Sequence, residues 1–265
     1  MTTANSEDLL TARVVLRAVL PLIRVMVADD PKKREQFRDT TGVIQFSARN
    51  GADTLCAHIR FDKGEFTLVQ EAAENPDVHF AFSSVAKMND MFRGRPVLPS
   101  PGPLVQSAFR NFGLLVKSFG LLLGLKLLMP DAAPKTPEQA RLKVKMTLYM
   151  ISTALSQLNK SGDPEMVKWT TKQPERIYQW SVNGTDIACH LRVKAGQTRA
   201  GRGPYERRQP FVHMKFAGID EALAILGNKV DLVDAMGKGM VVNDGSPEYG
   251  SRVGDFMQRI GNLLQ

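Results

Sequence analysis

The amino-acid sequence predicts an α+β fold built from two tandem copies of one domain. Three short segments recur in the same order about 133 residues further along the chain, which is typical of internal duplication. The matched pairs are Ile44–Asp53 with Tyr178–Asp186, Ala57–Arg60 with Cys189–Arg192, and Val78–Phe82 with Val212–Phe216. The 265 residues are enough for two modest domains, and the proline-containing linker before Lys135 predicts domains at 1–134 and 135–265.

Each copy is predicted to open with a long helix. Apolar residues recur near helical spacing over 7–27 and again over 137–159. Thr136 is suited to the N-cap of the second helix, and Pro137 to its first helical position. Helices of this length can cover one face of a sheet.

Strands are predicted where apolar and polar residues alternate. In each copy the first two flank an Asn-Gly pair, at 50–51 and 183–184, which is typical of a tight hairpin turn. The expected strands are 43–48, 53–61, 65–69 and 77–82 in the first copy, and 177–182, 186–193, 197–201, 211–216 and 240–242 in the second. The fourth strand of each copy should lead into a short helix that ends at a glycine: 84–93 with Gly94, and 219–227 with Gly227.

After these short helices the two copies differ in sequence. The second copy is predicted to close with the strand 240–242, a turn at 243–245 and a helix over 248–264. The first copy instead has a proline-rich segment, 96–103, followed by a strongly apolar run.

The predicted strands have one apolar and one polar face, because successive side chains of a strand point to opposite sides. The apolar face must be covered by helices. The polar faces of the two copies match residue by residue: Gln45, Ser47, His58, Arg60 and His79 correspond to Gln179, Ser181, His190, Arg192 and His213.

Several further pieces share an order with a known family. They are Asn75–Phe82, Met88–Gly94 and Leu114–Leu128 in the first copy, and Gln209–Val212, Ala222–Gly227 and Met240–Gly245 in the second. This order resembles the sterol carrier protein-2-like domain family, with its Pro-Asp-Val entry to the fourth strand, a short helix ending at glycine, a fifth strand and a closing helix. The second copy departs at Phe211, where the family pattern often has Asp, and the first inserts residues around 100–111. The resemblance implies, in each domain, a five-stranded and mainly antiparallel sheet covered on one face by helices that enclose an apolar tunnel.

The apolar faces and the resemblance together predict a non-enzymatic protein that binds or transfers a hydrophobic ligand, such as a sterol, a fatty acyl lipid or an isoprenoid-type molecule. The alternative function is a scaffold or assembly factor that presents lipid-like biosynthetic intermediates, such as quinone precursors, to partner enzymes. A closely packed core without ligand space fits the same spacing. The residues expected to line the pocket are Phe46, Ile59, Phe80, Phe82, Met88, Met91, Phe92, Leu121, Leu125, Trp180, Leu191, Met214, Phe216, Leu226, Met236, Met240, Phe256, Met257 and Ile260.

No catalytic residue, metal site or cofactor is expected. His58 and His79 would lie roughly 9–10 Å apart across the sheet, too far to share one zinc ion, so a solvated polar face or an interdomain contact is the simpler interpretation. The sequence contains neither a Gly-x-Ser-x-Gly elbow nor a phosphate-binding glycine loop. Cys56 and Cys189 do not occupy matched positions and form no disulfide framework, which is typical of a reducing compartment.

The net charge of +8 is concentrated in the second copy. Between residues 191 and 210 the only acidic side chain is Glu206, whereas the corresponding stretch of the first copy is acidic. The residues proposed for contact with an anionic membrane surface are Arg199, Arg202, Arg207 and Arg208. The alternatives are a solvated loop, or pairing with the acidic segment of the other copy in the same chain or in a homo-oligomer. Nucleic acid is not expected, since only Tyr205 is interleaved for base stacking.

Residues 112–129 form a long apolar run interrupted by Lys117 and Lys126. Both cations would be costly inside a bilayer, so this run is expected to line a pocket or to lie at a membrane interface. The polar and acidic segment Met1–Asp8 does not resemble a secretory signal. We therefore expect a cytoplasmic protein that associates peripherally with membranes.

Overall fold

The computed structural model describes residues 3–264 and confirms the α+β class, with two separate sheets. Contacts divide the chain into two units. Unit 1 extends to Met129, and unit 2 comprises Pro130–Leu263. The boundary predicted at residue 134 falls in the segment that precedes α6 (Pro137–Lys160).

Both predicted hairpins are confirmed. In unit 1, β1 (Gly42–Asn50) and β2 (Asp53–Asp62) pair antiparallel around Gly51, whose φ of +64° is the left-handed conformation that a tight turn needs. In unit 2, β5 (Arg176–Val182) and β6 (Ala188–Lys194) pair in the same way.

Both sheets are mainly antiparallel, as predicted, and each contains one parallel pair of strands. Unit 1 adds β3 (Glu65–Val69) and β4 (Val78–Phe82) in the order β3-β2-β1-β4. Unit 2 adds β7 (Gln197–Arg202), β8 (Val212–Phe216) and β9 (Val241–Gly245) in the order β7-β6-β5-β8-β9. The fourth strand of each unit runs parallel to the first, because β4 pairs with β1 and β8 with β5 in parallel register.

The prediction of five strands is correct for unit 2 and wrong for unit 1, whose sheet has four among the described residues. The segment expected to form the fifth strand is helical: it lies in α5 (Pro101–Leu125), which ends in a short 3₁₀ turn, Lys126–Leu128. The apolar residues of this run also repeat at helical spacing, and helix prevails because one side of it packs against β4.

The opening helix of unit 1 is interrupted. The chain is helical in α1 (Ser6–Val14), passes through a π-helical turn at Val15–Val19, and resumes as α2 (Leu22–Asp29). Pro21 explains the interruption, since it has no N–H to donate within a helix. The remaining helices of unit 1 before α5 are α3 (Pro31–Phe37) and α4 (Val85–Phe92).

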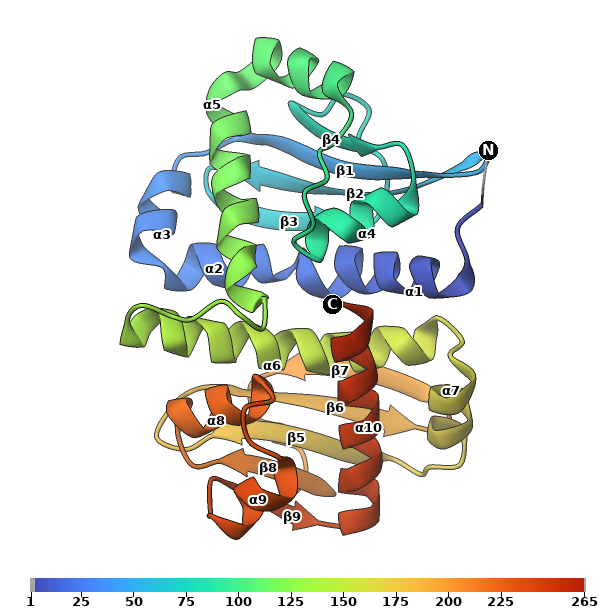
Figure 1. Ribbon diagram of the computed structural model, residues 1–265, viewed down its shortest axis with the longest axis vertical. Coiled ribbons are helices and arrows are strands. Elements are labelled where there is room, and N and C mark those ends of the chain that lie inside the picture. Colours follow the sequence, from blue (N-terminus) through green and yellow to red (C-terminus); the bar gives the residue numbers. More distant parts are fainter. Residues whose placement is uncertain (1–2, 265) are drawn as a thin grey trace. The chain divides into compact units, whose positions relative to one another are not determined.

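Unit 2 begins with α6, as predicted, with Thr136 accepting a hydrogen bond from the backbone N–H of Gln139 at 3.3 Å. The short helix α7 (Pro164–Thr171) was not predicted; it is capped by Asp163 and starts with proline. The other helices are α8 (Ile219–Leu226), α9 (Leu232–Gly237) and α10 (Pro247–Leu263). In Figure 1, α10 crosses the strands of its own sheet, as α5 does in unit 1.

Each unit buries the predicted apolar face of its sheet under helices. In unit 1, α4 contacts β1 and α5 contacts β4, while in unit 2, α6 contacts β6 and β7, and α10 contacts β8 and β9. The fully or almost fully buried residues of these faces include Phe46, Ile59 and Phe80 in unit 1 and Trp180, Leu191 and Phe216 in unit 2.

Candidate functional site

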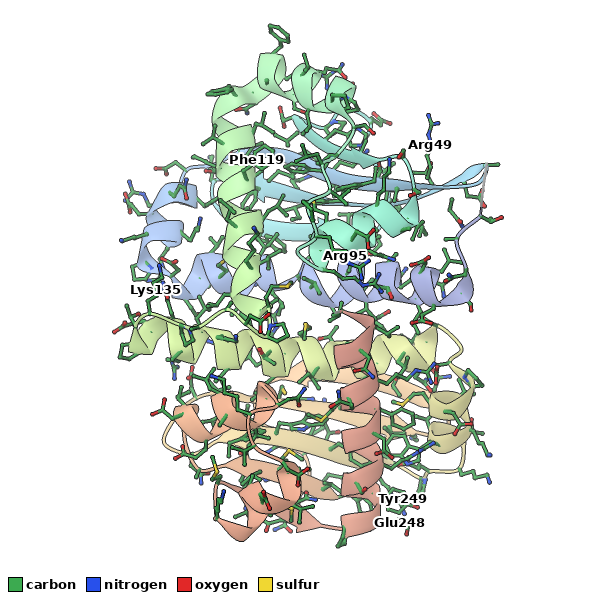
Figure 2. All side chains as sticks on the ribbon, in the orientation of Figure 1. Arg49, Arg95, Phe119, Lys135, Glu248 and Tyr249 are labelled. Carbon is green, nitrogen blue, oxygen red and sulfur yellow. The ribbon has the colours of Figure 1, made fainter. Side chains whose placement is uncertain are left out.

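An aromatic chain in unit 1 runs from the buried sheet to the protein surface. Phe46 of β1 stacks on Phe80 of β4 with ring centroids 5.1 Å apart, and Phe92 of α4 lies 6.0 Å from Phe46. On the other side, Phe119 of α5 contacts Phe80 edge-on at 5.4 Å. Phe80 is fully buried, whereas Phe119, labelled in Figure 2, is 39% exposed. The apolar interior of unit 1 is therefore continuous with the surface of α5.

The same helix carries a row of exposed apolar side chains, which we call the α5 stripe. Its members follow one another in alternating steps of four and three residues, so within each half of the helix they share one side: Val105 and Phe109 before Asn111, and Phe112, Val116, Phe119 and Leu123 after it. All six are exposed, to 88% at Phe109 and 67% at Phe112. The opposite side of α5 is buried through Leu114, Leu121 and Leu125. An exposed apolar row of this size is typical of an interaction surface.

α5 bends in the middle of the stripe. Asn111 has non-helical backbone angles, with φ −155° and ψ 78°. Its side-chain oxygen accepts a hydrogen bond from the N–H of Leu114 at 2.9 Å, which makes it the N-cap of the second half of the helix. Pro101–Leu128 is long and apolar enough to cross a membrane, judged by length and composition alone.

In unit 1 the connection from β3 to β4, residues 70–77, crosses the polar face of the sheet, and we call it the crossing loop. These two strands lie at opposite edges, so the connection must pass over β2 and β1. His58 donates from Nδ1 to the carbonyl oxygen of Glu71 at 2.8 Å, and Gln45 Oε1 accepts from the N–H of Ala73 at 2.7 Å. The expectation of a solvated face is wrong at Gln45 and His58, which are buried because the crossing loop covers them.

Unit 2 repeats this arrangement. His190 Nδ1 donates to the carbonyl oxygen of Gly203 at 3.0 Å, and Gln179 Oε1 accepts from the N–H of Tyr205 at 2.7 Å. The residues that the sequence matches between the two copies thus make the same bonds to the same loop. Gln and His recur here because their side chains hydrogen-bond to backbone groups of the loop that crosses the sheet. Without them, these backbone groups would have no partner on the sheet.

A serine–histidine pair joins β1 to β4. Ser47 Oγ lies 2.7 Å and the Gln45 amide nitrogen 3.1 Å from His79 Nε2. Because Ala73 fixes the orientation of the Gln45 amide, that nitrogen must donate, so His79 Nε2 is an unprotonated acceptor and the neutral imidazole carries its proton on Nδ1. Burial lowers the pKa of His79, which favours the same neutral form.

The corresponding pair in unit 2 has similar geometry. Ser181 Oγ lies 2.8 Å and the Gln179 amide nitrogen 3.3 Å from His213 Nε2. Burial and then Lys215 lower the pKa of His213, and Asp244 opposes them. Both imidazoles accept hydrogen bonds from two side chains of the neighbouring strand, so they tie the parallel strands of each sheet together.

Residues 3–264 contain no group of three or more His, Cys, Asp or Glu side chains that could hold a metal ion. Burial raises the pKa of Cys189 to about 12, and burial together with Glu71 raises the pKa of Cys56. Both thiols therefore stay protonated near neutral pH, in a form that is poor as a nucleophile or metal ligand.

A small pocket of about 260 Å³ lies beside His79, where the crossing loop meets the first half of α5. Its lining is polar: Glu74, Asn75, Pro76, His79, Pro103, Gln106, Ser107 and Arg110. None of the residues expected to line an apolar tunnel contributes to it. Arg110 donates to the carbonyl oxygen of Pro76 at 3.0 Å, so the two walls of the pocket are bonded to each other.

In unit 2 a guanidinium group at the start of β5 lies between two aromatic rings. Arg176 Cζ lies 4.2 Å from the ring centroid of Phe211 and 4.1 Å from that of Tyr249, which Figure 2 labels at the start of α10. Trp169 extends this cluster, with its ring 5.2 Å from Tyr178. Cation–π stacking of this kind fixes α10 against the sheet.

The basic residues near the third strand of unit 2 are partly compensated within that unit. Glu175 accepts from Arg192 at 2.7 Å and lies 3.6 Å from Arg208. Arg202 lies over the ring of Tyr149 at 5.2 Å. All four arginines proposed for membrane contact, Arg199, Arg202, Arg207 and Arg208, are nevertheless exposed.

The residues predicted to line a pocket are mostly core residues. Those that are buried are Phe46, Ile59, Phe80, Phe82, Met88, Leu121, Leu125, Trp180, Leu191, Met214, Phe216, Phe256 and Ile260. Those that are half-buried are Met91, Phe92, Leu226, Met240 and Met257. Met236 does not join them, because its side chain is 45% exposed on α9.

Two features were missed by reasoning from the sequence. The α5 stripe could have been found from its spacing, which starts at Val105, but the other side of the helix is equally apolar and hides it. The crossing loops could not be recognised before the strand order was known, although the matched Gln and His residues were their signal.

No family model and no curated protein sequence matches this chain. Among solved structures, Sterol Carrier Protein 2 Like 2 from Aedes aegypti is 17% identical over 42% of this chain and 97% of that protein, with a TM-score of 0.29. The inverting sec-alkylsulfatase Pisa1 from Pseudomonas sp. is 14% identical over 56% of this chain and 28% of the enzyme, with a TM-score of 0.25. A double mutant of that enzyme is 14% identical over 62% of this chain and 30% of the enzyme, with a TM-score of 0.26. These similarities are too low to carry a conclusion about function, which has to come from the residues of this chain.

Proposed function

We propose that the protein binds a hydrophobic, lipid-like ligand without performing chemistry, and that unit 1 is the binding unit. The observation that supports this is the aromatic chain from exposed Phe119 to buried Phe80 and Phe46. An acyl or isoprenoid chain would enter beside Phe119 and take the place of its contact with Phe80. Burial of apolar surface at roughly 25 cal/mol per Å² would drive this binding.

Two features favour unit 1 over unit 2. The helix over β4 is apolar on both sides, so its inner side can exchange a contact with the sheet for a contact with a ligand. In unit 2, by contrast, Arg176 occupies the aromatic cluster beneath α10.

The test is native mass spectrometry of the purified full chain, followed by organic extraction and lipid analysis. The two tryptophans of the chain, Trp169 and Trp180, both belong to unit 2, so their fluorescence reports on that unit. Phe119→Trp adds a reporter at the proposed entrance of unit 1. A dibrominated stearic acid should quench the added indole by contact and leave the native tryptophans unaffected.

Quenching of the native tryptophans instead would show that the ligand binds in unit 2. A ligand-free mass together with no quenching in either unit would contradict ligand binding altogether. Phe112→Trp is the matched control: Phe112 lies about two turns before Phe119 and is 67% exposed, so its indole should not be quenched by a ligand that replaces the contact of Phe119 with Phe80.

The second candidate function is a scaffold that presents lipid-like intermediates to partner enzymes. The observation that favours it is the close packing of Phe46 on Phe80, both of which are almost completely buried. Under this proposal the protein would carry no ligand of its own and would co-purify with enzymes at stoichiometric levels.

A further inference from the structure

The α5 stripe is the largest feature of unit 1 that ligand binding leaves unexplained. A ligand inside the unit needs only the inner side of α5 and the entrance at Phe119. The remaining members of the stripe point away from the sheet, and Val105, Phe109, Phe112, Val116 and Leu123 are more than half exposed. Their exposure to water is unfavourable unless another apolar phase covers them.

We infer that the α5 stripe docks on the surface of an anionic lipid bilayer. This inference rests on the proposed function, which it deepens by naming the source and destination of the ligand. Because Phe119 belongs both to the stripe and to the aromatic chain, docking would place the entrance of the ligand site against the membrane.

Charge around the stripe supports an anionic lipid surface. The segment 96–130 contains no Asp or Glu, but it carries Arg110, Lys117 and Lys126. Lys33 of α3 adds a further cation, since its Nζ donates to the carbonyl oxygen of Gly120 at 2.9 Å. Basic residues beside an apolar helix face are typical of attachment to anionic lipids.

α5 would lie on the membrane rather than cross it. Its inner side packs into unit 1 through Leu114, Leu121 and Leu125, and Lys117 donates to Thr40 Oγ1 at 2.8 Å. Spanning a bilayer would remove these contacts and would place Lys117 near the centre of the hydrocarbon, which is costly.

A bilayer also fits the stripe better than a partner helix does. The alternating spacing is that of a coiled-coil seam, but the bend at Asn111 divides it between two helical halves. A straight partner helix could follow only one half. A fluid surface requires no register and can receive both.

The experiment is co-sedimentation of the full chain with vesicles of phosphatidylcholine containing phosphatidylglycerol. The double variant Phe109→Ser/Phe112→Ser should bind these vesicles at least about tenfold more weakly, because two large apolar side chains no longer insert. Both positions are largely exposed, so the variant should fold. Lys126→Glu should weaken binding to these vesicles and leave binding to pure phosphatidylcholine vesicles unchanged.

The matched control is Val233→Ser/Val242→Ser, which removes exposed apolar side chains of unit 2, at 76% and 50% exposure. Equal loss of vesicle binding in the control, or normal binding by the stripe variant, would overturn the inference. The inference would also be overturned if light scattering showed that the protein self-associates, and if the stripe variant abolished this self-association but bound vesicles normally.

Failure of the proposed function would look different. Stripe-dependent vesicle binding by a protein that takes up no brominated fatty acid would leave membrane docking intact and remove the ligand site. Fatty acid uptake, together with vesicle binding that is the same in the stripe variant, would leave the ligand site intact and remove membrane docking by the stripe.

Discussion

Units 1 and 2 share one strand arrangement and close it in different ways. In unit 2, β9 pairs with the outer edge of β8. In unit 1 no strand among residues 3–264 pairs with the outer edge of β4, and two serines bond to this edge instead: Ser100 N–H donates to the carbonyl oxygen of Ala81 at 2.7 Å, and His79 N–H donates to Ser107 Oγ at 2.9 Å. Two sheets with the same strand arrangement and the same polar tethers can therefore be followed by segments that present different surfaces.

The two units also differ at single positions where β1 and β5 begin. In unit 1, Gly42 leaves space for Leu114, and Asp77 accepts a hydrogen bond from the N–H of Val43 at 2.8 Å. In unit 2, Arg176 and Phe211 stand at the matched positions and stack on each other. The second unit is fixed by a stacked guanidinium where the first has a helix that is apolar on both sides. This difference is why we assign the ligand to unit 1.

The largest expected effect comes from truncating the matched core residues of β4 and β8. Phe80→Ala should destabilise unit 1 by about 3–5 kcal/mol, because it removes the centre of the aromatic chain and leaves a cavity. Met214→Ala, its counterpart, should cost unit 2 about 2–5 kcal/mol. Hydrogen exchange should accelerate in β1 and β4 for the first variant and in β5 and β8 for the second. Equal acceleration in both sheets for either variant would contradict two separately stabilised units.

A smaller effect is expected at Gly201, which faces the imidazole of His190. A Cβ at this position would lie within van der Waals overlap of the ring, whereas the matched position opposite His58 is Val69. Gly201→Val should displace His190, break its bond to Gly203 and cost about 1–3 kcal/mol. Val69→Gly is the reciprocal control and should cost less than about 1 kcal/mol. Urea unfolding measures both costs, and a stable Gly201→Val variant would show that the imidazole is not a fixed tether.

Ser107→Ala tests the replacement of the fifth strand. The variant removes the acceptor for the backbone N–H of His79, which leaves a donor at the sheet edge without its partner. We expect a loss of about 1–2 kcal/mol and faster exchange of the His79 amide. Ser83→Ala, at an exposed position just after β4, is the control and should leave this amide unchanged. Unchanged exchange in Ser107→Ala would mean that the edge is protected by other groups.

The smallest effect is the pH dependence of the two serine–histidine pairs. The folded protein holds the pKa of His79 and His213 below the ordinary value of 6.5, so the unfolded chain binds protons first as the pH falls. Stability should therefore be complete above pH 6.5, decline as the pH falls through that value, and level off below the folded-state pKa values. The effect should be modest, because both imidazoles are partly exposed.

NMR titration of the two imidazoles separates the units. Asp244→Asn should lower the pKa of His213 further, since this carboxylate favours the imidazolium form. His79 should titrate as before, because burial is the cause of its shift. A change at both histidines, or at neither, would show that Asp244 does not distinguish the two pairs.

Several features could be predicted from the sequence because they depend only on neighbouring residues. The Asn-Gly pairs fixed both hairpins, strand alternation separated the apolar from the polar faces, and Thr136 with Pro137 began α6 at the predicted residue. The end of α8 was less exact: the left-handed residue there is Asn228, with φ 55°, rather than Gly227. Each of these features depends on dihedral preferences and hydrogen bonds that span only a few residues.

Tertiary structure decided the rest. The run from Leu114 is apolar enough for a strand or a helix, and only its packing against β4 made it helical, leaving Ser107 to complete the sheet edge. The strand order, which pairs residues far apart in the chain, determined that loops would cross the polar faces, burying His58 and partly covering His190. The apolar stripe of α5 became a surface because just one side of a helix can face its own sheet, and the sequence does not state which side that is.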